Sequence, residues 1–339
     1  MRNANPRNTR PFLDPVCRTI RHHAICRSIK KLARALTSPG YPILLQKICE
    51  NFMVQPLVSV LMTAYNRANF IGEAIESVLA STYQNFELII VDDQSKDETA
   101  FIARNYEQKD NRVRVYMNER NLGDYQNRNK AATYARGKYI KYLDSDDKIF
   151  DFGLEYCVNE MEKYPEAAIG MSLLYDMGAA DSICWSPEKI VREHLFDRPY
   201  LGIGPSGTII RLDKFIETGG FDTRFGVSSD MYFNIKMASY FPVVLLPKMY
   251  FYYREHEGQQ KNNEKGYLAM GYLYFKEVLE KVALPLRSDE INFLRRKLGK
   301  RHAVNLTRYL LRTGKFVDVR EVMRVTNFGF MDMVSGYFK

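Results

Sequence analysis

The feature that most constrains this chain is a regular alternation of apolar runs and helix-patterned segments between residues 56 and 147. The apolar runs have the length of strands and occupy residues 57–63, 86–92, 112–117 and 138–143, and the segments between them with helical periodicity are 70–79, 98–108 and 125–135. Strands that are apolar on both faces are typical of parallel sheets covered by crossover helices. The sequence therefore predicts an α/β fold with a Rossmann-like, mostly parallel sheet flanked by helices.

Polar residues follow each of these predicted strands at the point where the strand ends. They are Thr63-Ala-Tyr65-Asn66, Asp92-Asp93-Gln-Ser95, Asn118 to Gly123, and Asp144-Ser145-Asp146-Asp147. Ligands of open α/β sheets bind outside the carboxyl ends of the strands. Four polar strand ends in succession therefore predict one ligand site.

The turn at residues 144–147 places three carboxylates within four residues. Like charges this close raise one another's pKa unless a cation lies between them, and a hard divalent cation that also binds substrate phosphates is a common solution. An Asp-rich turn that caps a following helix is the alternative, since Asp is favoured at that position. The turn alone leaves both interpretations open.

These segments together resemble the motifs of family 2 glycosyltransferases. The resemblance covers residues 58–256 and rests on Val58-Ser-Val-Leu-Met-Thr-Ala-Tyr-Asn66, Glu87-Leu-Ile-Ile-Val-Asp-Asp-Gln-Ser95, Asn121-x-Gly123 with Arg128-Asn129, Gly137-Lys-Tyr-Ile-Lys-Tyr-Leu-Asp-Ser-Asp-Asp147, Gly219-Gly-Phe-Asp222 and Tyr253-Arg-Glu-His256. The resemblance implies a GT-A fold and inverting transfer of a sugar from a nucleotide donor, with a UDP-sugar as the first choice.

For the nucleotide, the resemblance implies that Thr63, Tyr65 and Asp93 contact the base. Asp93 would accept a hydrogen bond from the N3–H group of uracil. A carboxylate that faces this imide N–H can distinguish uracil from cytosine or adenine. Asp92 would support the ribose or the turn itself. The alternatives are turn chemistry at the strand end for both aspartates and a core position for the Tyr65 ring.

For the diphosphate, the resemblance places Arg128, Asp144 and Ser145 in the donor site. Arg128 would approach the diphosphate or hold the carboxylates of the Asp-x-Asp motif, with a surface cation on a helix as the alternative. Asp146 is the expected first ligand of Mn²⁺ or Mg²⁺, with Asp144 acting through the sugar, a water or the metal, and Asp147 as a cap. His256 is the expected late metal ligand, unless it only makes a hydrogen bond within its loop.

The expected catalytic base is Asp230, which lies at the position where the family has an acidic residue at the start of a helix. Many members have Glu-Asp where this chain has Ser229-Asp230, so one carboxylate is missing. A helix N-terminal carboxylate that interacts only with the helix dipole is the alternative. Gly219-Gly220 in the preceding turn are expected to supply positive φ angles.

The first fifty residues carry ten Lys and Arg residues against Asp14 and Glu50, whereas the remaining chain is nearly neutral. Residues 16–36 have the pattern of a basic amphipathic helix, and because its apolar stripe is thin and rich in Ala, packing on its own enzyme is placed slightly ahead of attachment to an anionic membrane surface. A solvated basic tail is the further alternative, and no nucleic-acid partner is expected. No apolar stretch reaches the roughly 18 residues of a transmembrane helix, no secretory signal is recognisable, and the five cysteines lack CxxC spacing. The cytoplasm is therefore the expected location, with peripheral attachment to the inner face of the membrane as one use of the basic segment.

We therefore expect a basic segment at residues 1–55, a GT-A domain at 56–258 and a helical region at 259–339. The domain would divide into a nucleotide-binding half (56–147) and an acceptor-binding half (148–258). Analogy with the family makes a glycan or lipid-linked glycan of bacterial surface glycan synthesis, such as a capsule or O-antigen, the expected acceptor. The rival functions are a sugar nucleotidyltransferase, for which the loop after the first strand lacks glycines, and a non-catalytic glycan-binding protein.

Overall fold

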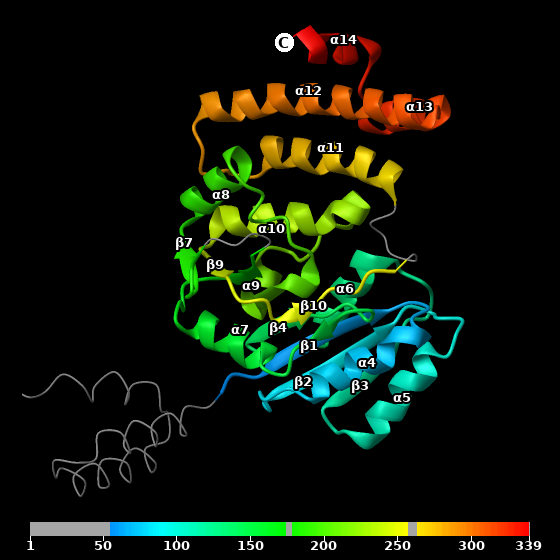
Figure 1. Ribbon diagram of the computed structural model, residues 1–339, viewed down its shortest axis with the longest axis vertical. Helices are drawn as coiled ribbons and strands as arrows, with labels where there is room; N and C mark the ends of the chain where they lie inside the picture. The colour runs from blue at the N-terminus through cyan, green and yellow to red at the C-terminus, as the bar shows by residue number, and fades with distance from the viewer. Residues whose placement is uncertain (1–54, 174–177, 257–262, 339) are drawn as a thin grey trace, which may run out of the picture. The chain divides into compact units, whose positions relative to one another are not determined.

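An eight-stranded mixed sheet forms the centre of the protein in a computed structural model that describes residues 55–173, 178–256 and 263–338 (Figure 1). Its strands are β1 (Val58–Ala64), β2 (Phe86–Asp92), β3 (Val113–Met117), β4 (Tyr139–Tyr142), β6 (Ile169–Ser172), β7 (Ile183–Trp185), β8 (Thr208–Arg211) and β9 (Val243–Leu246). They are ordered β3-β2-β1-β4-β8-β6-β9-β7. β8 is antiparallel to both of its neighbours, and β7 is antiparallel to β9. The prediction of a mostly parallel sheet flanked by helices is confirmed.

Helices cover the sheet and continue beyond it. Their bounds are α4 (Ala68–Leu79), α5 (Thr99–Lys109), α6 (Asp124–Ala132), α7 (Gly153–Glu162), α8 (Pro187–Phe196), α9 (Leu212–Glu217), α10 (Ser229–Tyr240), α11 (Glu264–Lys281), α12 (Ser288–Thr313), α13 (Phe316–Thr326) and α14 (Phe330–Phe338), with short 3₁₀ turns η1 (Pro205–Gly207) and η2 (Thr223–Ser228). In Figure 1, α4 and α5 lie on one side of β1 to β3 and α6 lies on the other. The predicted βα units therefore fold as the sequence pattern indicates.

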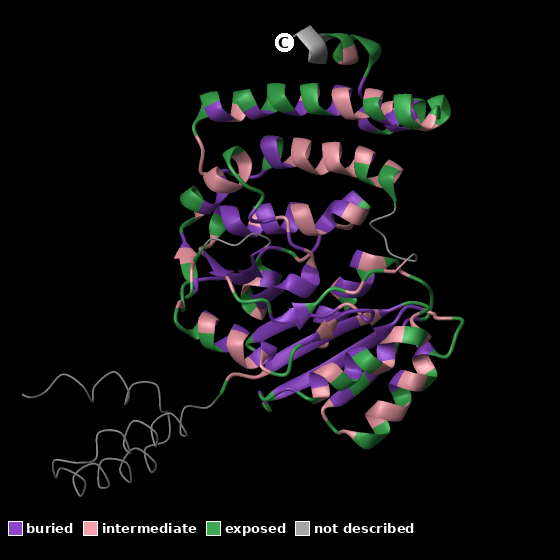
Figure 2. Cartoon of the chain, viewed as in Figure 1, coloured by how far each residue is buried: buried purple, intermediate pink, exposed green. Residues whose placement is uncertain are grey.

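Burial explains why these runs became strands. Every residue of β2 and β4 is buried, as is all of β1 except Thr63, and Figure 2 shows the sheet as the continuous buried layer of the protein. α4 is amphipathic instead, with Ile71, Ala74, Ile75 and Val78 buried at helical spacing. Removal of these apolar side chains from water stabilises the sheet.

The parallel register brings three strand ends to one edge of the sheet. Ala64 of β1 pairs with Asp92 of β2, and Asp92 pairs with Met117 of β3. On the other side of β1, Tyr142 of β4 pairs with Leu61, so that the turn beginning at Asp144 follows at nearly the same level. The four polar strand ends predicted from the sequence therefore meet.

Helices follow the last strand of the sheet and stack beyond it. α11 packs on α10 and η2, and α12 packs on α11. α13 contacts both α11 and α12, and α14 contacts α12. Figure 1 shows α10, α11 and α12 as successive layers away from the sheet. No helix in the described parts of the chain is long and apolar enough to cross a membrane. The helix predicted over residues 16–36 lies outside the described residues.

The expectation that Asp147 caps a helix is wrong. The residues that follow it form β5 (Lys148–Ile149), which pairs antiparallel with β10 (Phe251–Tyr252) in a separate two-stranded sheet. The next helix, α7, begins only at Gly153. The reason is that a distant segment of the chain supplies a strand partner here, which a local Asp-rich pattern does not reveal.

Gly137, which comes two residues before β4, lies against the backbone of Leu57 and β1. A Cβ atom at this position would lie 2.7 Å from Leu57 O and Ser59 N, which are backbone atoms and cannot move cheaply. We predict that Gly137→Ala lowers the free energy of unfolding by about 2 kcal/mol, as overpacking does, measured by urea denaturation. Gly299→Ala is the matched control, because a Cβ there meets nothing within 4 Å and helix propensity should raise stability by about 0.5–1 kcal/mol. Equal stability of the two variants would contradict this account of β4.

Candidate active site

A cavity of about 630 Å³ opens at the edge where the strand ends meet. It is lined by eight of the residues expected from the sequence, namely Thr63, Tyr65, Asp93, Arg128, Asp144, Ser145, Asp146 and Asp230. Of the remaining two, Asp92 is fully buried at the end of β2, and His256 contacts Asp146. The structure therefore brings the expected residues to one place, although it does not by itself assign them roles.

Asp93 is buried beneath the loop that follows β3. Its Oδ1 accepts hydrogen bonds from Asn118 Nδ2 at 2.7 Å and from the backbone N–H of Leu122 at 2.8 Å, and its Oδ2 accepts one from Gly123 N–H at 2.9 Å. A carboxylate offers about four acceptor directions. One direction on Oδ2 therefore remains for a donor in the cavity.

Asp92 has a different environment from its neighbour. Its side chain is fully buried, and Oδ1 accepts a hydrogen bond from Ser95 N–H at 3.0 Å, which closes the turn after β2. Its Oδ2 is buried without a hydrogen-bond partner among the described residues. Asp92 therefore stabilises the turn after β2 and does not line the cavity. This agrees with the alternative that Asp92 serves only the turn at the strand end.

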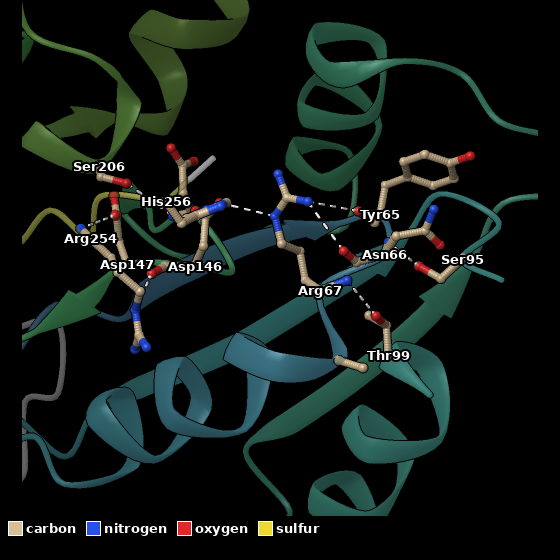
Figure 3. Close-up of polar contacts among 12 residues, drawn as sticks. Tyr65, Asn66, Arg67, Ser95, Thr99, Asp146, Asp147, Ser206, Arg254 and His256 are labelled. Carbon is tan, nitrogen blue, oxygen red and sulfur yellow. Dashed lines mark hydrogen bonds and ion pairs between the residues drawn. The ribbon is translucent and has the colours of Figure 1, made fainter. Parts of the chain in front are cut away.

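Tyr65 and Thr63 form the rim of the cavity at the end of β1. The Tyr65 side chain is 46% exposed, and Figure 3 shows its ring directed away from the cluster around Asp146. Tyr65 is therefore not a core aromatic, and its ring face is free to pack against a planar group in the cavity.

Arg128 of α6 is a buried guanidinium between two carboxylates. Its Nε donates to Asp124 Oδ1 at 2.8 Å, and its Nη1 lies 2.8 Å from Asp144 Oδ1 in an ion pair. Burial alone would lower the pKa of Arg128, but Asp124 and Asp144 raise it well above the ordinary value. Arg128 is therefore a fixed positive charge in the cavity wall, and the alternative of a surface cation is excluded by its burial.

Asp146 is paired with two side chains from distant parts of the sequence. Its Oδ2 accepts a hydrogen bond from Arg67 Nε at 2.9 Å and lies 2.9 Å from His256 Nε2. Figure 3 shows Arg67 reaching from the end of β1 toward Asp146 and His256. The His256 ring also stacks on Phe70, with ring centroids 4.6 Å apart. Asp146 therefore faces both an imidazole and a permanent cation.

The donor set at Asp146 fits a hard divalent cation in part. Two neighbouring ligands of an octahedral ion, each about 2.1 Å from it, lie about 3 Å apart, which is the separation of Asp146 Oδ2 and His256 Nε2. Arg67, however, binds the same oxygen. Among the residues that the structure describes, no group of three or more His, Cys, Asp or Glu side chains is arranged to hold a metal ion. A metal here would thus need ligands from the substrate as well, as phosphate oxygens provide.

Asp147 does not line the cavity and anchors the segment that carries His256. Its Oδ1 accepts a hydrogen bond from Arg254 N–H at 3.1 Å. Arg254 Nε also donates to the backbone oxygen of Asp146 at 3.0 Å. Burial and the nearby charge of Asp144 raise the pKa of Asp147 to about 7. Asp147 therefore joins the turn to the segment after β10.

Asp230 lines the same cavity from the first turn of α10, where the sequence places it. Its Oδ1 accepts a hydrogen bond from Met231 N–H at 2.8 Å. The surrounding protein removes enough water to raise the pKa of Asp230 to about 6, although Met231, the Tyr125 hydroxyl and Arg128 oppose the shift. A carboxyl group with this pKa is mostly ionised at neutral pH and remains basic enough to accept a proton.

The turn before α10 has the backbone geometry expected from its glycines. Gly219 and Gly220 have φ angles of 84° and 66°. Asn129 of α6 holds this turn, because its Nδ2 donates to Phe221 O at 2.8 Å and its Oδ1 accepts from Phe221 N–H at 3.0 Å. The helix that carries Arg128 is thereby tied to the segment that leads to Asp230.

Three residues of the site were not expected from the sequence. Ser206 Oγ accepts a hydrogen bond from Asp144 N–H at 3.0 Å, and Lys141, fully buried in β4, donates to Ser206 O at 2.5 Å. Arg67 lies at the end of the loop without glycines that follows the first strand. The position of Arg67, directly after the first strand, is a sequence signal for a cation in the site. Lys141 lies inside a buried strand, and the sequence does not indicate that its partner is Ser206.

Comparisons with known proteins agree on one family. Residues 59–205 match the family model described as Glycosyl transferase family 2. An uncharacterised glycosyltransferase of Methanocaldococcus jannaschii is 34% identical over 192 residues, which are 54% of this chain and 65% of that protein. A UDP-Glc:alpha-D-GlcNAc-diphosphoundecaprenol beta-1,3-glucosyltransferase of Escherichia coli is 41% identical over 107 residues, 32% of this chain and 42% of that protein. The chain thus covers less than two thirds of the length of either relative.

Among solved structures, the chain is similar to S. aureus TarS 1-349 in complex with UDP-GlcNAc. The TM-score is 0.65 with 19% sequence identity, and the match covers 82% of this chain and 81% of that one. Such low identity shows the fold alone, which is the GT-A fold expected from the sequence.

The buried charge of Arg128 gives a stability test of the site. Arg128→Met removes the cation and leaves Asp124 and Asp144 facing each other without it, so we predict a loss of about 3 kcal/mol in the free energy of unfolding at pH 7, measured by urea denaturation. Arg104→Met is the matched control, because its ion pair with Glu107 is partly exposed on α5 and should contribute less than about 1 kcal/mol. A loss at Arg128 no larger than at Arg104 would show that the cavity wall does not depend on this cation.

Proposed function

Because the chain contains a family 2 glycosyltransferase domain, we propose that it transfers a sugar from a nucleotide-sugar, with a UDP-sugar as the first choice, to a hydroxyl group with inversion at the anomeric carbon. The observation that carries this proposal is that one cavity is lined by the kinds of group that such a reaction needs. Asp93, Arg128 with Asp144 and Asp146, and Asp230 all line it. These groups suit the base, the diphosphate and the acceptor hydroxyl, respectively.

Base recognition is assigned to Asp93 together with the rim residues. The remaining acceptor direction of Asp93 Oδ2 suits the imide N–H of uracil, whereas cytosine offers an acceptor at that ring position. Thr63 and the exposed face of Tyr65 would flank the base. The E. coli relative is named for UDP-Glc and the TarS structure contains UDP-GlcNAc, which supports a UDP-sugar for this chain.

The diphosphate would lie against Arg128 and the turn at Asp144, Ser145 and Asp146. A divalent cation, Mn²⁺ or Mg²⁺, would be held by Asp146 and His256, with Asp144 toward the sugar or the metal, and would neutralise charge on the departing nucleoside diphosphate. Arg67 hydrogen-bonds the same Asp146 oxygen, so it would move away from this oxygen when the ion binds. Its guanidinium would then be available to the phosphates.

Asp230 is assigned as the base that accepts the proton of the acceptor hydroxyl as its oxygen attacks the anomeric carbon. Inversion requires the attack to come from the side opposite the leaving phosphate. Asp230 and the turn at Asp146 line the same cavity from different elements, Asp230 from α10 and the turn from the loop after β4. Its raised pKa also favours a catalytic role over a carboxylate that only complements the helix dipole.

A surface glycan, free or lipid-linked, is the proposed acceptor. The name of the E. coli relative specifies a diphosphoundecaprenol-linked sugar as its acceptor, and the resemblance to family 2 points the same way. Contact of residues 1–50 with an anionic membrane, and hence a cytoplasmic location at its inner face, belongs to the same proposal. Residues 1–50 lie outside the described part of the chain.

The division of the chain into a basic segment, a GT-A domain and a helical region, with boundaries after residues 55 and 258, is likewise proposed.

The proposal is tested by the pH dependence of transfer. A base must be ionised, so kcat/KM for a UDP-sugar donor should rise about tenfold per pH unit below pH 6 and level off above it, in keeping with the pKa of Asp230. Asp230→Asn should lower kcat about 10²–10⁴-fold and leave UDP binding within about twofold. Because burial raises this pKa above that of the unfolded chain, ionisation of Asp230 disfavours folding above pH 6, and the variant should have a higher Tm at pH 7.5.

Asp222→Asn is the matched control for this variant. Asp222 lies in the turn before α10, where its carboxylate pairs with Arg224, and it does not line the cavity. Its replacement should leave kcat within about threefold. If kcat/KM of Asp230→Asn still falls below pH 6, or if this variant is nearly as active as the wild type, Asp230 is not the catalytic base.

A further inference from the structure

A second cavity lies between α11 and α12 and is larger than the one at the strand ends. Its volume is about 730 Å³, and it is open along one side. Part of its wall is aromatic, from Tyr267, Tyr272, Tyr274, Phe275 and Tyr309. None of the residues assigned above to the donor, the metal or the base lines this cavity, which we call the α11–α12 groove.

The α11–α12 groove is formed by two facing helical stripes. On α11, Tyr267, Gly271 and Tyr274 recur at i, i+4 and i+7 and therefore lie on one face. On α12, Arg301, Asn305, Arg308 and Arg312 recur at i, i+4, i+7 and i+11, so that the arginines span about 16 Å of the helix axis. A Cβ atom at Gly271 would meet nothing within 4 Å, so the α11 wall is open at this point.

The charge of the α11–α12 groove is positive and only partly balanced. Arg312 pairs with Glu264 at the end of the groove, with Nη1 and Oε1 3.0 Å apart. Arg301 and Arg308 have no carboxylate within ion-pair distance in the described ranges. His302, which also lines the groove, is kept neutral because burial lowers its pKa to about 4. Two guanidinium groups therefore remain available to an anionic ligand.

The groove continues into the cavity that contains Asp230. Tyr267 lines both cavities, and Ser228 and Met231, which lie on either side of Asp230 in sequence, line the groove. The charge of Asp230 contributes to raised pKa values of Tyr267 and Tyr274, behind burial as the main cause. A chain lying in the groove can therefore present its end to Asp230.

We propose that the α11–α12 groove binds the acceptor of the transfer reaction and that this acceptor is an acidic glycan, a saccharide chain with carboxylate or phosphate groups. This inference rests on the proposed function, because it assigns the second substrate of the same site. Tyrosine faces pack against the apolar C–H faces of sugar rings, as aromatic side chains do with extended ligands. Arginine forks bind carboxylate or phosphate through two parallel hydrogen bonds. An aromatic stripe that faces an arginine stripe along one groove fits a repeating chain rather than a single ion.

The test compares an acidic and a neutral saccharide of the same length. Tetragalacturonate and maltotetraose are titrated into the full chain by calorimetry, with UDP at saturation so that the donor cavity is occupied. We expect tetragalacturonate to bind at least about tenfold more tightly, because two charge-assisted contacts distinguish it. Equal affinity for maltotetraose would overturn the acidic character of the acceptor. Displacement of tetragalacturonate by geranyl diphosphate at comparable concentration would overturn it as well, since the groove would then bind the diphosphate of a lipid linker.

Two matched pairs of variants locate the binding. Arg301→Glu/Arg308→Glu should weaken tetragalacturonate binding at least about tenfold, whereas Arg296→Glu/Lys300→Glu, with the same change in net charge on another face of α12, should change it less than about twofold. Gly271→Leu fills the groove and should abolish binding, whereas Gly299→Leu, in open space outside the groove, should not. Equal losses in both charge variants would show general attraction to a basic chain and contradict the groove.

Donor hydrolysis separates failure of this inference from failure of the proposed function. Gly271→Leu and Arg301→Glu/Arg308→Glu should hydrolyse a UDP-sugar and bind UDP as the wild type does, because the altered residues do not line the donor cavity. If the wild type binds UDP but does not bind tetragalacturonate, the groove proposal is overturned and the proposed function is not. Absence of UDP binding in the wild type would overturn the proposed function, whatever the groove binds.

Discussion

The buried guanidinium of Arg128 is the interaction on which the rest of the site depends. It holds Asp124 and Asp144 on either side of it, and without it these carboxylates would lie together with no positive charge between them. α6, which carries Arg128, begins directly after Gly123, whose N–H binds Asp93, and Asn129 on the same helix holds the turn before α10. The short helix α6 therefore contacts three parts of the site: Asp93, proposed to bind the nucleotide base, the turn at Asp144, and the segment that leads to Asp230, the proposed proton acceptor. A shift of α6 would move all three.

Concentrating these groups at one sheet edge has a cost in folding free energy. Asp92 Oδ2 is buried without a partner among the described residues, and burial raises the pKa values of Asp147 and Asp230. Each of these features disfavours the folded state at neutral pH. The buried strands β1, β2 and β4 offset this cost, because their apolar side chains are removed from water along their whole length. The stable sheet thus positions a polar edge that would not be stable alone.

Much of this arrangement was predictable from the sequence, and the failures have physical reasons. The strand runs were recognisable because parallel strands are apolar on both faces, and β2 has the bounds predicted for it. The polar strand ends were recognisable because parallel connections bring every carboxyl end to one edge. Asp147 was misjudged because its role depends on the pairing of β5 with β10, about a hundred residues away in sequence. Arg67, Lys141 and Ser206 were missed because their partners are distant in sequence, and the α11–α12 groove appears only when two helices pack.

The affinity of the protein for UDP, measured by calorimetry in Mn²⁺ and in EDTA, tests the central claim most directly. The account predicts that UDP binds at least about tenfold more tightly with Mn²⁺, since the ion would link the diphosphate to Asp146. It also predicts that Asp146→Ala removes this difference, whereas Asp151→Ala, at an exposed position outside the cavity, preserves it. Equal affinity in Mn²⁺ and EDTA, or a full Mn²⁺ effect in Asp146→Ala, would contradict the account.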